Sequence, residues 1–439
     1  MKPGHWMMGA AAAVLLGVSL APPAAAAEGE QYLAGLVYRT GAYAPNGIPF
    51  ANGMADYYAL LNARDGGING VKLNYEECDT GYATDRGVEC YERLKNNGPT
   101  GTPFTNPLST GITFALTEKA PIDKISVISM GYGRSESRDG SVFQWNFPLL
   151  GTYWTAADLI IQHIGKLNGG LDKLKGKKIA LVYHDSPYGK EPIPLLQKRA
   201  EMHGFEFTAM PVTHPGVEQK ATWLQIRRSR PDYVLLWGWG VMNSTAIKEA
   251  AGVGYPREQM FGVWWSGAEP DVEPAGDGAI GYSAVTLQHG AGLYPVHEDV
   301  KKHLYDAGKG STKWEDVGEV LYNRGLVNAM LGSEAIRTAM AKFGNKPLTG
   351  EQVRWGLENL DVTAERLTEL GFGDMLRPIK ITCSDHEGAR SGRIHTWDGK
   401  KWSFSSDWYT ADDSVLLPMV KAAAAAYAKE KNITPVDCK

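Results

Sequence analysis

The sequence lacks a surplus of charge of either sign. It carries 45 Lys and Arg residues against 49 Asp and Glu residues, for a formal net charge of −4 at pH 7. Proteins that bind nucleic acid or anionic membrane surfaces carry a basic excess, because they neutralise phosphate groups. The balance therefore argues against nucleic-acid and membrane partners, and it leaves a small molecule or another protein.

Long apolar runs are also missing beyond the N-terminus. The first residues combine a basic Lys2, an apolar stretch from Trp6 to Leu20 and a small-residue run from Ala24 to Ala27. This is the three-part layout of a secretory signal, and its apolar stretch is short for a membrane span. We expect residues 1–27 to be a cleaved signal peptide. The mature protein is then expected outside the cytoplasm.

Cysteine is scarce. The four cysteines all follow the predicted signal, and an even count in an oxidising compartment predicts two disulfides. Their spacing shows no Cys-x-x-Cys pair of the kind that binds metal. Cys78 closes a predicted strand and Cys90 lies on the helix that follows. We therefore predict the pairs Cys78–Cys90 and Cys383–Cys438.

Catalytic motifs are absent as well. The sequence has no His-Glu-x-x-His, no Gly-x-Ser-x-Gly and no phosphate-binding loop, and its 10 histidines are scattered. Gly131 and Gly133 lack the third glycine of a dinucleotide fingerprint. His184 and Asp185 stand beside Ser186, but adjacency in sequence does not produce the geometry of a catalytic triad. We expect no enzyme activity, no cofactor and no metal.

Alternating strands and helices fill the rest of the chain in two series. A length of 439 residues exceeds the roughly 250–300 residues at which single cores stop growing, so two domains are expected. The predicted strands are 32–38, 71–77 and 125–129 in the first series, and 177–183, 205–210, 232–237 and 260–263 in the second. This alternation predicts an α/β protein of two doubly wound, Rossmann-like lobes.

Aromatic residues follow two strands of the second series. Residues 232–240 (DYVLLWGWG) and 260–267 (MFGVWWSG) each read as a buried strand that ends in glycine and tryptophan. Ligands of open α/β sheets bind beyond the carboxyl ends of the strands. We therefore expect tryptophans here to wall a pocket, although each of them is equally compatible with core packing. They are Trp237, Trp239, Trp264 and Trp265.

Small polar residues mark the first series. Ser109, Thr110 and Gly111 stand before a predicted helix and offer hydroxyl groups and free backbone N–H groups, as a carboxylate site requires. Plain capping of the helix is the alternative for any one of them. The loop 130–133 follows the next strand and points to the same edge of the sheet.

Three segments carry a resemblance to a known family: 60–73 (LLNARDGGINGVKL), Cys78-Asp79 and 180–189 (ALVYHDSPYG). Over nearly the whole mature chain the sequence resembles the type I periplasmic solute-binding proteins of ABC importers, in the leucine/isoleucine/valine-binding group. The resemblance implies two lobes joined by three crossings, with a small-molecule ligand trapped by hinge closure. It also implies a periplasmic location and permease subunits as partners. We expect a monomer.

The resemblance places the lobes and the site. The lobes are expected at 28–147 plus 283–378 and at 148–282 plus 379–439. In the family, Ser/Thr residues after the third strand and the loop after the fourth hold the ligand's carboxylate. The predicted ligand-binding residues are Tyr43, Ser109, Thr110, Gly111, Met130, Gly131, Tyr132, Gly133, Asp185, Tyr188, Trp239, Trp264 and Trp265.

One departure from the family bears on the ligand. Amino-acid binders place an acidic residue after the strand 260–263, where this chain has Trp264. A buried ammonium without a partner is costly. We therefore predict an aromatic or hydrophobic carboxylate without an α-amine. The alternatives are a branched-chain amino acid, with Glu269 or Asp185 as the acid, and an uncharged amide. A secreted sensor would show the same sequence features as an importer component.

Overall fold

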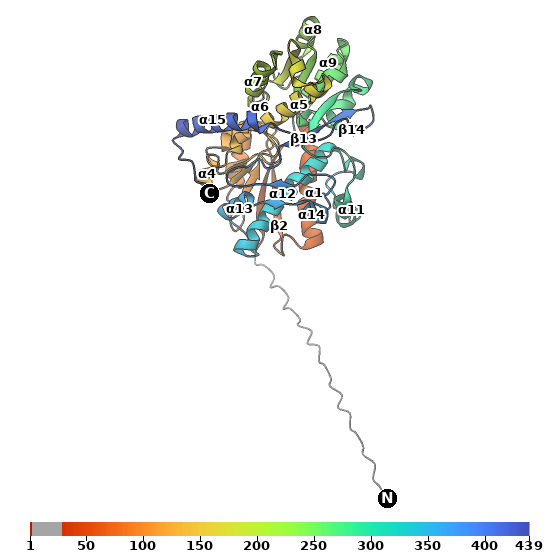
Figure 1. Ribbon diagram of the computed structural model, residues 1–439. Coiled ribbons are helices and arrows are strands. Elements are labelled where there is room, and N and C mark those ends of the chain that lie inside the picture. Colours follow the sequence, from red (N-terminus) through yellow and green to blue (C-terminus); the bar gives the residue numbers. More distant parts are fainter. Residues whose placement is uncertain (2–28, 439) are drawn as a thin grey trace.

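The computed structural model describes residue 1 and residues 29–438 (Figure 1). The predicted signal peptide therefore lies outside the described residues, apart from Met1. Within the part that is described, no helix combines the length and apolarity needed to cross a bilayer. Two α/β lobes, each built on its own sheet, make up the fold, as the alternation in the sequence predicts.

The first lobe contains a parallel sheet in the order β2-β1-β3-β4-β5. Strand β1 is buried along its whole length, because helices cover both faces of the sheet. Its residues alternate: Leu33 packs toward α1 and α12, and Tyr32 and Leu36 pack toward α2 and α3. The strands are β1 (Gln31–Val37), β2 (Leu73–Asp79), β3 (Phe104–Asn106), β4 (Ser126–Ile128) and β5 (Asn146–Phe147).

The second lobe contains the larger sheet, in the order β14-β13-β10-β9-β8-β6-β7, with β15 paired to β13. The strands from β7 to β10 are parallel, and β13 and β14 close the edge as an antiparallel hairpin. The strands are β6 (Lys178–His184), β7 (Glu206–Val212), β8 (Tyr233–Trp237), β9 (Met260–Gly262), β10 (Ser283–Thr286), β13 (Ser391–Trp397), β14 (Trp402–Phe404) and β15 (Tyr409–Thr410).

Helices α1 and α12 are the central pair of the first lobe, and they approach closely at two glycines. A Cβ on Gly53 would lie 2.0 Å from the Tyr322 carbonyl oxygen, and one on Gly325 would lie 2.1 Å from that of Phe50. The helices of this lobe are α1 (Ala44–Asp65), α2 (Thr84–Leu94), α3 (Thr110–Leu116), α4 (Ala120–Asp123), α11 (Pro295–Val300), α12 (Val320–Phe343), α13 (Gly350–Glu358) and α14 (Ala364–Glu369).

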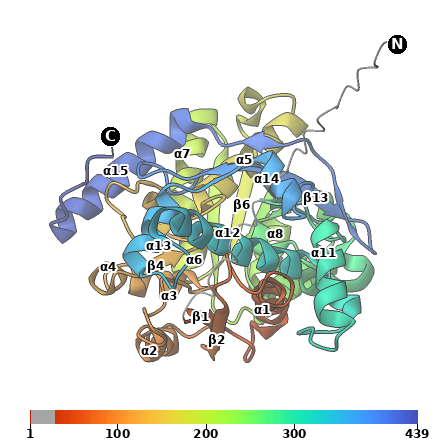
Figure 2. The same ribbon diagram turned by 90° about the horizontal axis from the view of Figure 1, so that it is seen from below.

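The helices of the second lobe are α5 (Tyr153–Leu167), α6 (Pro187–Lys190), α7 (Ile193–His203), α8 (Lys220–Ser229), α9 (Val241–Gly252) and α10 (Glu269–Val272). Three connections join the lobes, at 148–152, 287–294 and 381–390. In Figure 1 the second lobe lies above the first, and α15 (Asp413–Lys431) crosses at the level between them. Figure 2 shows α15 along the edge of the molecule.

Three segments lie elsewhere than the sequence led us to expect. Strand β10, assigned to the first lobe, pairs with β9 and β13 because it continues the second sheet. Residues 379–380, assigned to the second lobe, form β12 (Ile379–Lys380) and pair with β11 (Asp361–Val362), which lies in a segment of the first lobe. Helix α15, assigned to the second lobe, packs on the first through Tyr427, whose ring stacks on Phe143 at 4.7 Å.

Both predicted disulfides are present in the structure. Cys78 and Cys90 join the end of β2 to α2 across 12 residues. Cys383 and Cys438 join the third connection between the lobes to the C-terminal tail, across 55 residues. The second bridge therefore holds the segment after α15 against the hinge region, which the sequence spacing alone does not reveal.

Candidate functional site

A small cavity lies between the two lobes, at the carboxyl ends of their parallel strands. This is where open α/β sheets bind ligands, because the loops after the strands converge there. Both lobes supply its walls. The lining residues are Tyr38, Phe50, Tyr82, Leu108, Ser109, Thr110 and Tyr132 from the first lobe, and Tyr153, Tyr188, Trp239 and Trp265 from the second.

Most of these side chains follow directly from strand ends. In the first lobe, Tyr38 follows β1, Tyr82 lies just after β2, residues 108–110 follow β3 and Tyr132 follows β4. In the second lobe, the lining side chains stand on α6 after β6, in the turn after β8 and on the short helix η4 (Trp264–Ser266) after β9. Phe50 and Tyr153 come instead from α1 and α5.

The chemistry of the walls is aromatic and hydroxylic. Eight of the eleven lining residues are Tyr, Trp or Phe, and none of the described lining residues is charged. Tyr132 and Tyr188 use their hydroxyls within the protein, donating to the carbonyls of Ile128 at 3.2 Å and Gly238 at 2.7 Å. Burial raises the pKa of the lining tyrosines, so they remain neutral hydroxyls at physiological pH.

Four hydroxyl groups gather on the side of the first lobe. The Tyr82 hydroxyl lies beside Ser109, and the Tyr153 hydroxyl lies beside Thr110. The Ser109 oxygen accepts a capping bond from the Ile112 N–H at 3.4 Å and still has a proton to donate. We call Ser109, Thr110, Tyr82 and Tyr153 the hydroxyl cluster. It offers several neutral donors to one anionic group.

Contacts across the lobes show that the cleft is closed. Nε1 of Trp264 and Nε1 of Trp265 both donate to the carbonyl of Gly131, at 2.5 and 2.8 Å. The Tyr43 hydroxyl lies 2.7 Å from Nε2 of His184. Arg324, on α12, donates to the carbonyl of Trp264 and stacks on the Trp265 ring at 4.8 Å. The ligand space is therefore sealed by hydrogen bonds that form only when the lobes meet.

The structure divides the predicted residues into those that line the cavity and those that do not. Six line the cavity: Ser109, Thr110, Tyr132, Tyr188, Trp239 and Trp265. Gly131 and Tyr43 lie on the closure contacts just described. Gly111, Met130, Gly133, Asp185 and Trp264 are not among the lining residues.

Trp264 differs most from expectation. Its side chain is fully buried behind the cavity wall, where its ring packs close to Gly151. Its neighbour Trp265 faces the cavity instead. Asp185 lies outside, in an ion pair with Lys190 at 2.8 Å. Met130 belongs to the core of the first lobe.

Sequence reasoning missed five lining residues. Tyr38 and Tyr82 follow strands β1 and β2, so the rule about carboxyl ends could have found them. Leu108 precedes the predicted Ser109 by one residue. Phe50 and Tyr153 stand on helices among other buried residues, and only the assembled fold turns them toward the cavity.

Neither candidate acid, Glu269 or Asp185, is among the lining residues, and neither is the nearby Asp271. Asp271 is buried and accepts hydrogen bonds from Asn46, Asn243 and the Ala268 N–H at 2.8 to 3.0 Å. Glu269 accepts from the Val320 N–H at 3.1 Å, and burial raises its pKa to about 8. Both carboxyl groups are therefore engaged in structural contacts.

A cavity between two doubly wound lobes, with no charged side chain among its described lining residues, is the arrangement of a two-lobed solute-binding protein. Residues 30–401 match the family described as periplasmic binding protein, so the chain belongs to that family. It is a substrate-binding protein of the kind that serves ABC transporters, as the resemblance in the sequence implies. No curated protein matches the chain.

Solved structures extend the comparison. One described as an ABC transporter permease from the Pseudomonas fluorescens group is 44% identical, with a TM-score of 0.86, covering 93% of this chain and 99% of that chain. A branched-chain amino acid ABC transporter from Thermus thermophilus with bound valine is 22% identical, with a TM-score of 0.73 and coverage of 90% and 100%. A solute-binding protein from R. palustris in complex with benzoate is 14% identical, with a TM-score of 0.67 and coverage of 88% and 98%. The last two share the fold.

Glu191 reaches across from the second lobe to the first. Its Oε1 accepts the Ser135 N–H at 2.6 Å, and its Oε2 has no hydrogen-bond partner among the described residues. Burial raises the pKa of this carboxyl to about 8, and the nearby Glu136 adds to the rise. Glu191 is therefore largely protonated in the folded protein at neutral pH.

We expect the protein to lose stability as the pH rises from 6.5 to 8. In this window the folded state keeps a proton on Glu191 that the unfolded chain has released, so unfolding becomes more favourable. One such group accounts for about 2 kcal/mol over the window. Glu269 acts in the same direction, whereas the lowered pKa of His184, about 4, matters only below pH 6.5.

Urea denaturation at the two pH values measures this effect. The Glu191→Gln variant keeps the shape of the side chain without the titration, so its stability should depend less on pH than that of the wild type. An unchanged pH dependence in the variant would show that Glu191 does not hold the proton.

Proposed function

We propose that this protein is the extracytoplasmic binding component of an ABC importer that captures a small aromatic or hydrophobic carboxylate without an α-amine. It delivers the ligand to permease subunits in the inner membrane, acts as a monomer without catalysis, and reaches the periplasm through a cleaved signal at residues 1–27. The hydroxyl cluster binds the carboxylate, and the rings of Trp239 and Trp265 pack against the body of the ligand.

The observation that carries this proposal is the absence of an acid among the described lining residues. An α-ammonium group loses its water when the lobes close, and a buried charge without a counter-charge is costly. A carboxylate, by contrast, meets the donors of Ser109, Thr110, Tyr82 and Tyr153. The cavity therefore has partners for the carboxylate of an organic acid but none of opposite charge for the ammonium group of the corresponding amino acid.

The size and shape of the cavity point to a compact ligand. The space left between the closed lobes is small, so we expect a compact ligand such as a single ring or a short branched chain. Trp239 and Trp265 meet edge to face at 5.6 Å, which leaves aromatic surface for a flat body. Benzoate and 4-hydroxybenzoate bound to R. palustris proteins of the same fold support this size class.

We expect a thermal-shift screen to separate the two ligand classes. Each aryl acid is paired with an amino acid of similar body, such as phenylacetate with phenylalanine. A ligand at a hundred times its dissociation constant stabilises the folded protein by about 2.7 kcal/mol, which is a clear shift. The acids should shift the melting temperature and the amino acids should not.

A branched-chain amino acid is the second candidate, favoured by the valine complex of the Thermus thermophilus structure. Strong shifts with leucine or valine and none with aryl acids would replace the first proposal. A secreted sensor is the third candidate. Co-purification of the ligand-loaded protein with membrane permease subunits favours import over sensing.

A further inference from the structure

Trp239 holds an unsatisfied donor in the wall of the cavity. The indole is buried, with 4% of the residue exposed, and it is one of the lining residues. Its Nε1 has no hydrogen-bond partner among the described residues. An indole nitrogen can only donate, and a buried donor without an acceptor is destabilising. The two neighbouring lobe-closing tryptophans differ, because Trp264 and Trp265 both donate to Gly131.

Tyr38 is the polar neighbour of this indole. The two rings meet edge to face at 6.3 Å, and the Tyr38 hydroxyl lies near the indole nitrogen without hydrogen-bond geometry. Should a small movement let Tyr38 accept the Trp239 proton, the tyrosine would then present its own proton to the cavity. In both arrangements this part of the wall offers a donor.

We propose that the ligand carries an oxygen acceptor besides its carboxylate, and that Trp239 donates to it. The proposal rests on the proposed function, which assigns the carboxylate to the hydroxyl cluster. The chemical class is an aryl or similarly flat acid with a carbonyl, ether or hydroxyl oxygen in addition to its carboxylate. An amine in that place does not fit, because its protons would oppose the Trp239 N–H.

Three benzoates of nearly equal size test this inference by calorimetry on the whole protein. 4-Formylbenzoate carries an acceptor, 4-methylbenzoate carries neither donor nor acceptor, and 4-aminobenzoate carries chiefly donors. We expect the formyl compound to bind roughly tenfold tighter than the methyl compound, equivalent to about 1.4 kcal/mol. The amino compound should bind no tighter than the methyl compound.

The Trp239→Phe variant is the matched test of the donor. It keeps an aromatic wall and removes the N–H, so the tenfold preference for 4-formylbenzoate over 4-methylbenzoate should vanish, whatever the smaller ring does to the affinity for both compounds. The Tyr38→Phe variant removes only a hydroxyl. If Trp239 donates directly to the ligand, this variant should keep the preference for 4-formylbenzoate. Should Trp239→Phe fail to fold, the wild-type series decides alone.

The outcomes separate this inference from the proposed function. If the wild type binds all three benzoates with equal affinity, or binds 4-aminobenzoate most tightly, the proposed oxygen acceptor is wrong. The proposed function in binding an organic acid is then unaffected. A preference that survives in Trp239→Phe overturns the role of Trp239. Failure of all three to bind, together with binding of an amino acid, overturns the proposed function itself and the acceptor with it.

Discussion

Replacing Arg199 with Met is expected to lower the free energy of unfolding by about 3–5 kcal/mol, the usual cost of removing one partner from a buried ion pair. Arg199 on α7 and Asp158 on α5 have side chains that are 1% and 0% exposed. Nε of Arg199 donates to Asp158 at 2.8 Å, and Nη2 contacts the same carboxylate. Without the guanidinium, Asp158 keeps a charge in a site that water does not reach.

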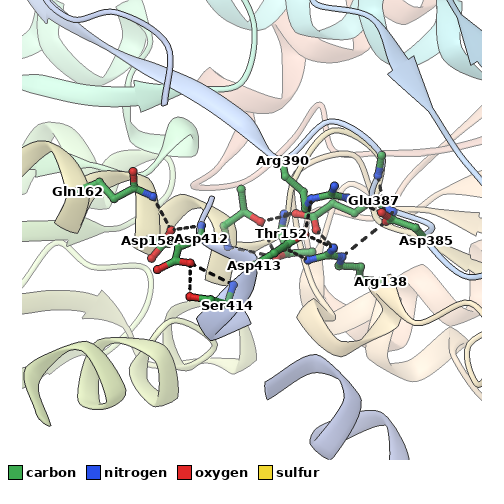
Figure 3. A network of polar contacts seen from close by, with 12 residues as sticks. Arg138, Thr152, Asp158, Gln162, Asp385, Glu387, Arg390, Asp412, Asp413 and Ser414 are labelled. Carbon is green, nitrogen blue, oxygen red and sulfur yellow. Dashed lines mark hydrogen bonds and ion pairs between the residues drawn. The ribbon is translucent and has the colours of Figure 1, made fainter. Parts of the chain in front are cut away.

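The surroundings of Asp158 add to this cost. Its second oxygen accepts the Asp412 N–H at 2.8 Å and the Gln162 side chain at 2.7 Å (Figure 3). Both of these groups donate N–H protons, which suits an ionised carboxylate. Burial nevertheless raises the pKa of Asp158 even with Arg199 present. Without Arg199, the Asp158 carboxylate must either take up a proton or move with its surroundings, and both cost free energy.

Urea denaturation of the variant and the wild type measures the loss. Lys173→Met serves as a control, because Lys173 forms an exposed pair with Asp172 and should cost nothing measurable. The double variant Arg199→Met with Asp158→Leu should recover much of the loss, since replacing both partners of a buried pair by apolar groups is often neutral. A loss below 1 kcal/mol in the single variant would contradict this account.

Removing the Cys383–Cys438 bridge is expected to cost about 4 kcal/mol. The bridge closes a loop of 55 residues, and the chain-entropy account makes stabilisation grow with loop length. Replacing both cysteines with Ser frees the unfolded chain, while other contacts still hold α15 in place in the folded state. These contacts include the pair Lys421–Asp139 at 2.9 Å and the pair Lys431–Glu118 at 2.8 Å.

The other disulfide provides the matched comparison. Cys78–Cys90 spans 12 residues, so replacing both of its cysteines with Ser should cost less, about 3 kcal/mol. Denaturation of the two double variants, with and without reductant, ranks the bridges. A smaller loss for the Cys383/Cys438 variant would mean that its tail does not restrict the unfolded chain as the loop length implies.

The start of α15 explains why the tail matters to the hinge. Asp412 pairs with Arg199 of the second lobe at 3.1 Å, and Asp413 pairs with Arg138 of the first lobe at 2.6 Å. Arg138 also lies 3.4 Å from the buried Glu387, whose carboxyl accepts the Thr152 N–H at 2.9 Å (Figure 3). The N-cap and the first residue of α15 thus contact the two lobes, one each.

Several features followed from the sequence because they depend on neighbours along the chain. In the run 232–240, apolar and polar residues do not alternate as they would in a strand with one face in water. The run also ends at glycine, so it indicates a buried parallel strand with Trp239 beyond its carboxyl end. Cys78 and Cys90 belong to one strand and the helix after it, and their pairing followed from that proximity.

Other features depend on contacts between distant segments, which the sequence does not display. Trp264 and Trp265 are adjacent and chemically alike, and the turn of η4 decides that one packs behind the wall and the other faces the cavity. Phe50 and Tyr153 reach the cavity because α1 and α5 are held there by their own lobes. Strand β10 lies in the second sheet because it forms backbone hydrogen bonds with both β9 and β13.

The sequence by itself determined the α/β class, the two series of strands, the family resemblance and the Cys78–Cys90 bridge, because hydrophobic period, glycine position and the spacing of neighbouring cysteines are local properties. Only the tertiary structure decided that the lining of the cavity carries no charge among its described residues, that Trp239 keeps a free donor, and that the start of α15 contacts both lobes. These properties arise when side chains from segments far apart in the chain are brought to one place and compete for the same partners.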